Sequence, residues 1–412
     1  MKRKLTISSS QHRYPVNFHR SATSLVRAIA ENRTMTVAQK KKKPGNGDES
    51  AILFFAIDRQ VHKHYRKEFD DLSGLAGSQI LQFLVPSGEQ SKSIEMWQKI
   101  TDYLLEQGVR RNTPVIAVGG GVTGDLAGFA ASTVMRGLPL IQVPTTLLAM
   151  VDSSVGGKTG INHKCGKNLI GSFYPPRSIE LSTEFLATLP PKEWMNGVSE
   201  ILKYGAISDP RIFQACRQLF MPDADGDSGQ DTAHPASGHK EHTGDASADG
   251  TAKFVQPIPA PGDPKLVQLI EKSIRIKAAI VEQDEKESGA RMFLNFGHTF
   301  AHALEKLAGY GTISHGEAVF IGMIAAVHLS NRLGASVDPA NIERFSPLYP
   351  MPELHLPNRY EELTDQMYRD KKRSSSRLKL ILLQDWGAPY VTETDDRAAV
   401  MDAWRYAMER VR

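Results

Sequence analysis

Short apolar runs alternate with amphipathic stretches through the first half of this 412-residue chain. The run at 51–57 (AILFFAI) has the length of a strand, and similar runs lie at 80–85, 114–118 and 140–143. Runs that are apolar throughout are typical of parallel strands covered on both faces. Because helical stretches separate these runs, the pattern predicts an α/β fold with a mainly parallel sheet.

The second half of the chain has mostly the hydrophobic period of helices. Residues 266–282 read as an amphipathic helix, 318–329 as a long buried helix and 395–411 as a terminal helix. Residues 379–383 are strand-like. We therefore expect this half to be mainly helical.

Two features indicate how the chain is divided. A chain of this length exceeds one ordinary core, and Leu189-Pro190-Pro191 interrupts it, so we expect an α/β domain at 1–187 and a helical domain at 188–412. Residues 221–265 are rich in Asp, Gly, Ser, Ala, His and Pro and poor in large apolar residues, which predicts a disordered insertion. The lysine-containing stretch at 39–50 is expected to be a solvated loop.

Composition narrows the class of protein. The net charge of +4 is mild for this size and gives no case for a general nucleic-acid or membrane partner. The two cysteines, Cys165 and Cys216, point to a reducing compartment. The N-terminus lacks the apolar region of a signal peptide, and no run of about 18 apolar residues is present. We therefore expect a cytoplasmic protein.

Three histidines, His298, His302 and His315, lie within one short stretch. The first two are four apart and share one face of a helix. Imidazoles brought together from two helices suit a catalytic metal ion, which typically takes three protein ligands and leaves one position open. An HxxxH pair alone would as readily arise by chance. A missing ligand would come from elsewhere, and Glu200, on an apolar helical stretch with Lys203, is one candidate.

A glycine turn, Gly119-Gly120-Gly121-Val122-Thr123-Gly124-Asp125, follows one predicted strand and precedes a helix. This setting places a diphosphate at a helix N-terminus. The letters satisfy GxGxxG, but the acidic residue expected about 20 positions later is absent. Asp58, at the end of the strand at 51–57, is placed to hold a ribose instead. The alternative is that the glycines serve only close helix–strand packing.

Cationic and amide side chains follow this turn. Lys158, Lys167 and Asn168 lie in the glycine-rich region 138–171, and Arg136 precedes it. We expect these residues to lie on glycine-rich loops, where their side chains would suit a phosphate or a carboxylate. The alternative is a set of surface lysines, which the many neighbouring glycines make less attractive.

Six segments, taken together and in order, resemble the 3-dehydroquinate synthase family of the sugar phosphate cyclase superfamily. They are GGGVTGDLAGFAAS, RGLPLIQVPTTLLAMVDSSVGGKTGINH, GKNLIGSFYPP, EILKYGAI, LNFGHTFAHALE and SHGEAV. The resemblance extends from about residue 51 to residue 383, with the insertion as a gap. It implies a Rossmann-like NAD-binding α/β domain followed by a mostly α-helical domain that binds metal and substrate.

The resemblance also implies the site residues. A divalent metal ion, Zn or Co, would be held by Glu200, His298 and His315, and His302 would face the substrate as an acid/base or phosphate-binding group. NAD would lie against Asp58, Glu89, Lys92, Gly120, Gly121, Val122, Asp125, Thr145, Thr146, Lys158, Lys167, Phe185 and Thr188. The substrate would be held by Asp152, Lys158, Asn168, Lys203, Lys277, Glu287, Arg291, Asn295, His302 and either Lys371 or Lys372. In a homodimer, Arg136 would reach the substrate of the neighbouring subunit.

The implied reaction converts 3-deoxy-D-arabino-heptulosonate 7-phosphate to 3-dehydroquinate and phosphate in the shikimate pathway. It proceeds by transient oxidation with NAD, β-elimination of phosphate, reduction and intramolecular aldol closure. The alternatives are another sugar phosphate cyclase, of the valiolone or deoxy-inosose type, a metal-dependent alcohol or glycerol dehydrogenase, and a binding protein without activity. The many phosphate-binding cations argue against the dehydrogenase, and the filled catalytic positions argue against the binding protein.

Overall fold

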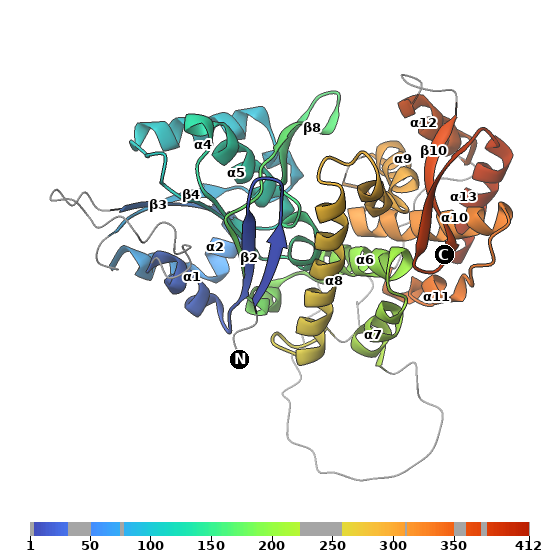
Figure 1. Ribbon diagram of the computed structural model, residues 1–412, viewed down its shortest axis with the longest axis horizontal. Helices are drawn as coiled ribbons and strands as arrows, with labels where there is room; N and C mark the ends of the chain where they lie inside the picture. Colours follow the sequence, from blue (N-terminus) through green and yellow to red (C-terminus); the bar gives the residue numbers. More distant parts are fainter. Residues whose placement is uncertain are drawn as a thin grey trace, which may run out of the picture.

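The computed structural model describes residues 4–31, 51–74, 78–222, 258–309, 311–349, 360–371 and 377–411. The predictions for 39–50, for most of 221–265 and for the side chains of Lys371 and Lys372 lie outside the described residues. In Figure 1 a sheet with helices on both faces lies beside a helical part, and α8 (Pro264–Gln283) runs between the two.

The main sheet has seven strands in the order β1-β2-β9-β6-β5-β3-β4. Their bounds are β1 Lys4–Ser8, β2 Arg13–Phe18, β3 Ala51–Asp58, β4 Ser78–Val85, β5 Val115–Gly119, β6 Leu140–Pro144 and β9 Ser178–Leu181. Neighbouring strands are parallel except β1 and β2, which form an antiparallel hairpin. The predicted mainly parallel sheet is therefore confirmed.

Strand β2 is not marked by a continuous apolar run in the sequence. Its RYPVNF sequence contains Pro15, and proline is unfavourable inside a sheet because it has no N–H to donate. The structure accommodates this residue because β2 pairs with β9 only from Val16 onward.

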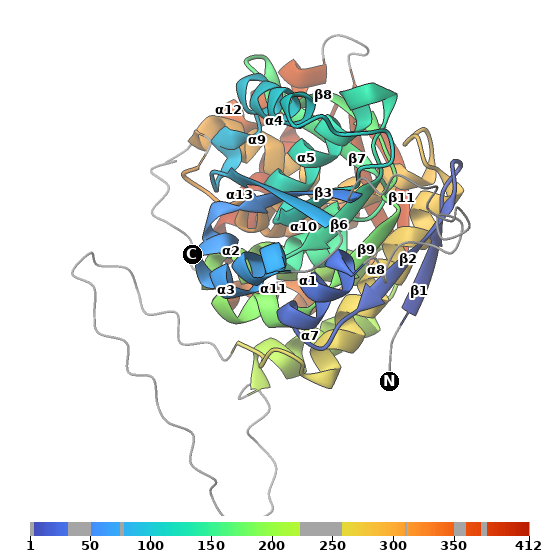
Figure 2. The same cartoon turned by 90° about the vertical axis from the view of Figure 1, so that its left-hand side faces the viewer.

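Alternate residues of β3 point to opposite faces of the sheet, as the period of a strand requires. Phe54 and Ala56 join the hydrophobic cluster that contains residues of α4 (Ile94–Glu106) and α5 (Gly121–Thr133). Phe55 and Ile57 join the cluster on the other face, where α1 (Ala22–Ala30), α2 (Arg59–His64) and α3 (Arg66–Asp70) lie (Figure 2). Because both faces are covered, the strand is apolar throughout.

The helical part is built around α10 (His315–Arg332), which packs against α6, α9, α13 and β10. The other elements are α6 Pro191–Ile207, α7 Arg211–Phe220, α9 His298–Ala308, α11 Ala340–Glu343, α12 Tyr360–Lys371, α13 Arg397–Arg410 and the hairpin β10 Leu378–Asp385 and β11 Ala388–Thr394. The predicted helices and the predicted strand at 379–383 are confirmed, whereas the domain boundary between 187 and 188 stays a prediction. Among the described helices, none combines the length and the apolar character needed to cross a membrane.

The segment that carries Lys158, Lys167 and Asn168 is a β-hairpin, so the expectation of glycine-rich loops was wrong. The antiparallel strands β7 (Lys158–His163) and β8 (Gly166–Phe173) pair Gly160 with Gly171. A Cβ atom on Gly171 would lie 2.2 Å from the carbonyl oxygen of Thr159. These glycines therefore permit close approach of two strands, which sequence alone does not distinguish from loop flexibility.

Candidate active site

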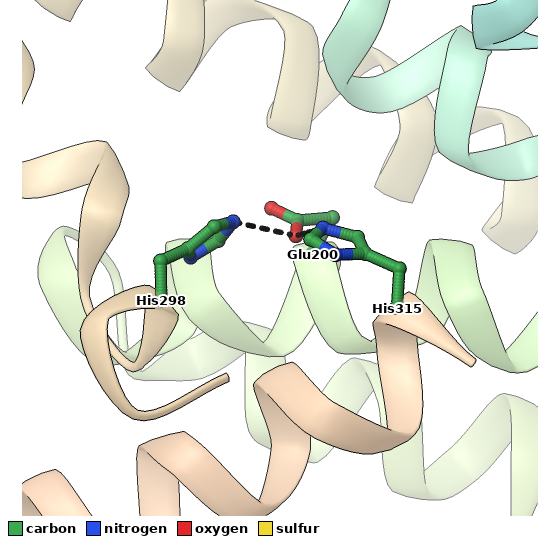
Figure 3. Close-up of side chains that lie close together, drawn as sticks. All are labelled: Glu200, His298 and His315. Carbon is green, nitrogen blue, oxygen red and sulfur yellow. Dashed lines mark ion pairs between the residues drawn. The ribbon is translucent and has the colours of Figure 1, made fainter. Parts of the chain in front are cut away.

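Three helices of the second part bring together the three expected metal ligands (Figure 3). Glu200 lies in α6, and His298 and His315 are the first residues of α9 and α10. Oε1 of Glu200 lies 3.5 Å from Nε2 of each histidine, and one ligand atom from each residue falls within 4.8 Å of the others. Two ligands of a tetrahedral zinc ion, each about 2.0–2.1 Å from it, lie about 3.3–3.4 Å apart, so this spacing fits a metal ion.

Glycines allow these helices to approach closely. A Cβ atom on Gly322 of α10 would lie 2.1 Å from the carbonyl oxygen of Gly297, the residue before α9. A Cβ atom on Gly316 would lie 2.5 Å from Cα of Asn196 on α6. Asn196 Oδ1 also accepts a 2.8 Å hydrogen bond from the N–H of Gly316. The small residues thus set the separation between the helices that carry the ligands.

The charges around the three ligands favour a cation. Both carboxylate oxygens of Glu200 are buried, and neither receives a hydrogen bond of regular geometry from the described residues. Burial would raise the pKa of Glu200, but the neighbouring Lys203 and His298 outweigh it and lower that pKa. Burial lowers the pKa of His298 to about 3, which leaves a neutral imidazole, as a metal ligand must be. The buried, ionised carboxylate of Glu200 and the neutral imidazole of His298 both fit a bound metal ion.

Lys203 links the three candidate metal ligands to Asp152. We call these ligands, Glu200, His298 and His315, the metal-type triad. Lys203 forms ion pairs with Glu200 and, at 3.7 Å, with Asp152, which lies in the π-helix Ala149–Ser153. Lys277 Nζ lies 2.9 Å from Oδ2 of Asp152, and the Tyr204 hydroxyl donates to Oδ1 at 2.5 Å. Burial would raise the pKa of Asp152, but the two lysines outweigh it and hold it below its usual range. Asp152 is thus an ionised acceptor next to two cations.

A second cluster surrounds Glu287. Its carboxylate pairs with Lys158 of β7 and accepts a 2.7 Å hydrogen bond from Nδ2 of Asn295. Arg291 is 2% exposed, and its Nη2 donates to the carbonyl oxygen of Gly156 at 3.0 Å. Predicted substrate residues from both halves of the chain therefore meet here.

The glycine turn has the form of a diphosphate site. Gly120 is the N-cap of α5, and no side chain caps this helix. A Cβ atom on Gly120 would lie 3.0 Å from Cγ2 of Thr146, and the N–H of Thr145 donates to the carbonyl oxygen of Gly119 at 3.0 Å. The first turn of α5 begins with Gly121 and Val122. Because no side chain caps this turn, its N–H groups can bind an anion.

The predicted NAD contacts beside this turn are tied to the β7–β8 hairpin. Lys92 Nζ donates to Asp125 Oδ2 at 2.6 Å and to Asn168 Oδ1 at 2.5 Å. Glu89 accepts a 2.7 Å hydrogen bond from Nδ2 of Asn162. Two residues predicted to bind NAD, Lys92 and Glu89, therefore contact the hairpin, which also carries the predicted substrate residue Asn168.

Asp58 and Phe185 differ in what they offer a cofactor. Asp58 ends β3 and accepts from the Ser87 hydroxyl at 2.6 Å, at the edge where a ribose was expected. The side chain of Phe185 is buried edge-on against Tyr65, with ring centroids 4.9 Å apart, and the Thr188 hydroxyl donates to the Phe185 carbonyl oxygen at 3.4 Å. The ring of Phe185 is thus packed inside the fold, and its backbone carbonyl oxygen already accepts a hydrogen bond.

Two residues next to the site, Glu305 and Tyr204, were missed in the sequence analysis. Glu305 lies 3.3 Å from Nζ of Lys167 and 3.6 Å from Nδ1 of His315, so it connects the hairpin to a metal-type ligand. Its position two helical turns after His298 placed it on the same face of α9, which was a usable clue. Tyr204 follows Lys203 directly, and no pattern marks it.

Arg136 and His302 are exposed. Arg136 has a φ of 64° and follows Met135, whose φ is 50°, so two successive non-glycine residues are left-handed. The ring of His302 lies 5.8 Å from that of His298, centroid to centroid. His302 thus stands one turn from the metal-type triad without joining it.

Solved structures with a similar fold cover nearly the whole chain. The 2-epi-5-epi-valiolone synthase ValA from Streptomyces hygroscopicus subsp. jinggangensis, solved with NAD+ and Zn2+, has a TM-score of 0.73 and 21% identity over 98% of this chain and 99% of its own. A 2-deoxy-scyllo-inosose synthase, solved with carbaglucose-6-phosphate, NAD+ and Co2+, has a TM-score of 0.71 and 22% identity over the same shares, 98% and 99%. A probable glycerol dehydrogenase from Sinorhizobium meliloti has a TM-score of 0.54 and 15% identity over 96% of each chain. The fold is therefore that of the sugar phosphate cyclases.

Sequence relatives identify the family. The 3-dehydroquinate synthase of Salinibacter ruber is 39% identical over 85% of this chain and 86% of its own, and that of Geobacter metallireducens is 39% identical over 85% and 88%. The family models for the N-terminal and C-terminal parts of 3-dehydroquinate synthase match residues 82–196 and 248–373. The chain belongs to the 3-dehydroquinate synthase family and is an enzyme. The resemblance, fold class and activity expected from the sequence are confirmed.

Proposed function

We propose that the chain binds NAD, a divalent metal ion and 3-deoxy-D-arabino-heptulosonate 7-phosphate, and releases 3-dehydroquinate and phosphate. The observation that carries this proposal is the direct contact between the metal-type triad and the charged cluster of Lys203, Asp152 and Lys277. Lys203 pairs with Glu200 of the triad on one side and with Asp152 on the other, and Asp152 also holds Lys277. A phosphorylated polyol needs both kinds of group within reach of one molecule.

The residues present fit both cofactors. Glu200, His298 and His315 would hold the metal ion, and the first turn of α5 with Asp58 would hold NAD. When bound, NAD accepts and returns a hydride, and the metal ion polarises substrate oxygens as a Lewis acid. Three protein ligands leave room for substrate oxygens on the metal ion.

The charged side chains around the triad would orient the sugar and hold its phosphate. Asp152, kept ionised by its two lysines, is an acceptor for substrate hydroxyl groups. Lys158 is half exposed and paired with Glu287, so its ammonium group is available to a phosphate. His302 is exposed one turn from His298 and would exchange a proton with the substrate or contact its phosphate.

A homodimer forms part of this proposal, with Arg136 completing the site of the neighbouring subunit. Support comes from exposed apolar side chains close to Arg136 in the chain and along β8. Met135 is 38%, Leu169 62% and Phe173 41% exposed. A mass measurement in solution tests the dimer, and mixed dimers of Arg136→Ala subunits with an inactive partner test the shared site.

We also propose the domain limits 1–187 and 188–412 and a cytoplasmic location. The domain limits are supported by the last strand of the main sheet, which ends at Leu181, and by α6, which begins at Pro191. The cytoplasmic location is supported by two unpaired cysteines, one of them buried.

The experiment that tests the activity uses the purified protein with heptulosonate phosphate, NAD and Zn2+. We expect equal amounts of inorganic phosphate and dehydroquinate, with NAD unchanged at the end. Net formation of NADH without phosphate would indicate a dehydrogenase instead. Phosphate release with a different sugar phosphate, and no dehydroquinate, would indicate another cyclase.

A further inference from the structure

Asp284 ends α8 and binds the backbone of the loop that follows it. As the C-cap residue of α8 it has extended backbone angles, so the chain turns away from the helix there. Its Oδ1 accepts from the N–H and the hydroxyl of Ser288, at 3.0 Å and 3.2 Å. Its Oδ2 accepts from the N–H groups of Gly289 and Arg291, at 2.6 Å and 3.1 Å. One carboxylate thus gathers three backbone N–H groups and one hydroxyl group.

This loop carries two of the residues proposed to bind substrate. Glu287 sits in the loop with a φ of 62°, a left-handed conformation that is unfavourable for a side chain other than glycine. Arg291 follows at its end, in the 3-10 helix Ala290–Asn295. A strained loop keeps its shape only when its surroundings determine it. The bonds to Asp284 do so, because they tie the residue before the loop to the backbone that follows Glu287.

The loop is also fixed from outside by the first part of the chain. The N–H of Ser8 donates to Glu282 at 2.6 Å, and that of Ser10 donates to Glu285 at 2.8 Å. Arg291 donates to the carbonyl oxygens of Glu285 and Gly156. The contacts with Ser8, Ser10 and Gly156 set where the loop lies, whereas those of Asp284 set its internal shape.

The charge state of Asp284 agrees with this structural role. Hydrogen bonds from the backbone, that of Ser288 first, outweigh desolvation and lower the pKa of Asp284 to about 2. The carboxylate therefore stays ionised as an acceptor near neutral pH. Its four hydrogen bonds lie within the loop, and none goes to the metal-type triad or to Asp152.

We propose that Asp284 is a positioning residue, which folds residues 285–291 so that Glu287 and Arg291 meet the substrate. It would not touch the substrate itself. The inference rests on the proposed function for what the loop binds, whereas the folding of the loop is independent of it. The removal of Asp284 should therefore loosen the loop and weaken substrate binding without loss of the metal ion.

The test compares Asp284→Ala and Asp284→Asn with the control Asp209→Asn in the full-length enzyme. Asp209 also accepts a backbone N–H and pairs with Arg211 and Lys272, but it lies outside the site. Asparagine at 284 keeps one acceptor oxygen and serves if the alanine variant does not fold. We expect faster amide exchange at 285–291 with α8 unchanged, KM for the sugar phosphate raised about 10- to 100-fold with a smaller change in kcat, and full metal content.

Two results would overturn the inference. One is amide exchange at 285–291 that stays as slow as in the unaltered enzyme. The other is faster exchange throughout the chain, which would make Asp284 a general stabilising residue. If the unaltered enzyme does not turn over heptulosonate phosphate, the proposed function fails, while the exchange data still decide the role of Asp284 in the loop.

Discussion

The imidazole rings of His298 and His302 lie 5.8 Å apart and nearly perpendicular, at 85°, on successive turns of α9. Of these two histidines, His298 lies 3.5 Å from Glu200 and belongs to the group of three that fits a metal ion, and that group does not include His302. Two histidines at a spacing typical of shared metal ligands therefore occupy different places. The pair offers a direct test of how the site is divided.

His298→Ala should lose the bound metal ion, whereas His302→Ala should keep it and lose rate. Because the loss of an outer-shell partner already weakens metal binding about 10- to 100-fold, the loss of a ligand should cost more. The loss of an acid/base group should lower kcat by about 10²–10⁴-fold. Metal content by mass spectrometry and steady-state kinetics measure the two effects. Equal metal loss in both variants would contradict the division.

Gly322→Ala should weaken metal binding from a position outside the ligand set. The added Cβ atom would meet the backbone of Gly297 and push α9 away from α10, which carry His298 and His315. Overpacking of this kind costs about 1–3 kcal/mol of stability. The control is Gly205→Ala on α6, where the new Cβ atom would meet the side chain of Phe213 at 3.1 Å. Metal affinity and thermal unfolding of both variants check the prediction, and the control should change metal affinity less.

The parts of the fold that the sequence predicts are those set by local periodicity. The run at 51–57 is apolar throughout because both faces of β3 are buried, and this can be read from neighbouring positions. Strand β2 and the β7–β8 hairpin depend on pairing with distant segments, so their composition of proline and glycine was misleading. Local periodicity cannot predict such pairing.

For the site too, the sequence predicted some residues and missed others. Spacing alone suggested His298 and His302 as a pair and left Glu200 as one candidate, and the resemblance to a family chose among them. No periodicity places Tyr204 against Asp152 or makes Asp284 a backbone acceptor. Those contacts depend on how a π-helix and a helix end are oriented, and tertiary packing determines both.

Asp58→Asn should weaken NAD binding without disturbing the fold. The three hydrogen bonds that Asp58 accepts, from Ser87 Oγ and from the N–H groups of Gln60 and Val61, all end on Oδ1. Asparagine keeps that oxygen and replaces Oδ2, which would otherwise accept from a ribose hydroxyl. A hydrogen bond to a charged group contributes about 1.5–3 kcal/mol, so the dissociation constant for NAD should rise about tenfold or more. Calorimetric titration measures it, and Asp70→Asn, a surface change, should leave it unaltered.

Removal of residues 223–247, joined by a short glycine-serine linker, should leave activity and stability unchanged. The segment contains no Leu, Ile, Val or Phe, and it lies between the two regions matched by the family models, 82–196 and 248–373. A segment without large apolar side chains contributes little to a hydrophobic core. Steady-state kinetics with the sugar phosphate and thermal unfolding of the shortened enzyme check this. A loss of turnover with an unchanged unfolding temperature would mean that these residues act on the site, and a lower unfolding temperature would mean that they support the fold.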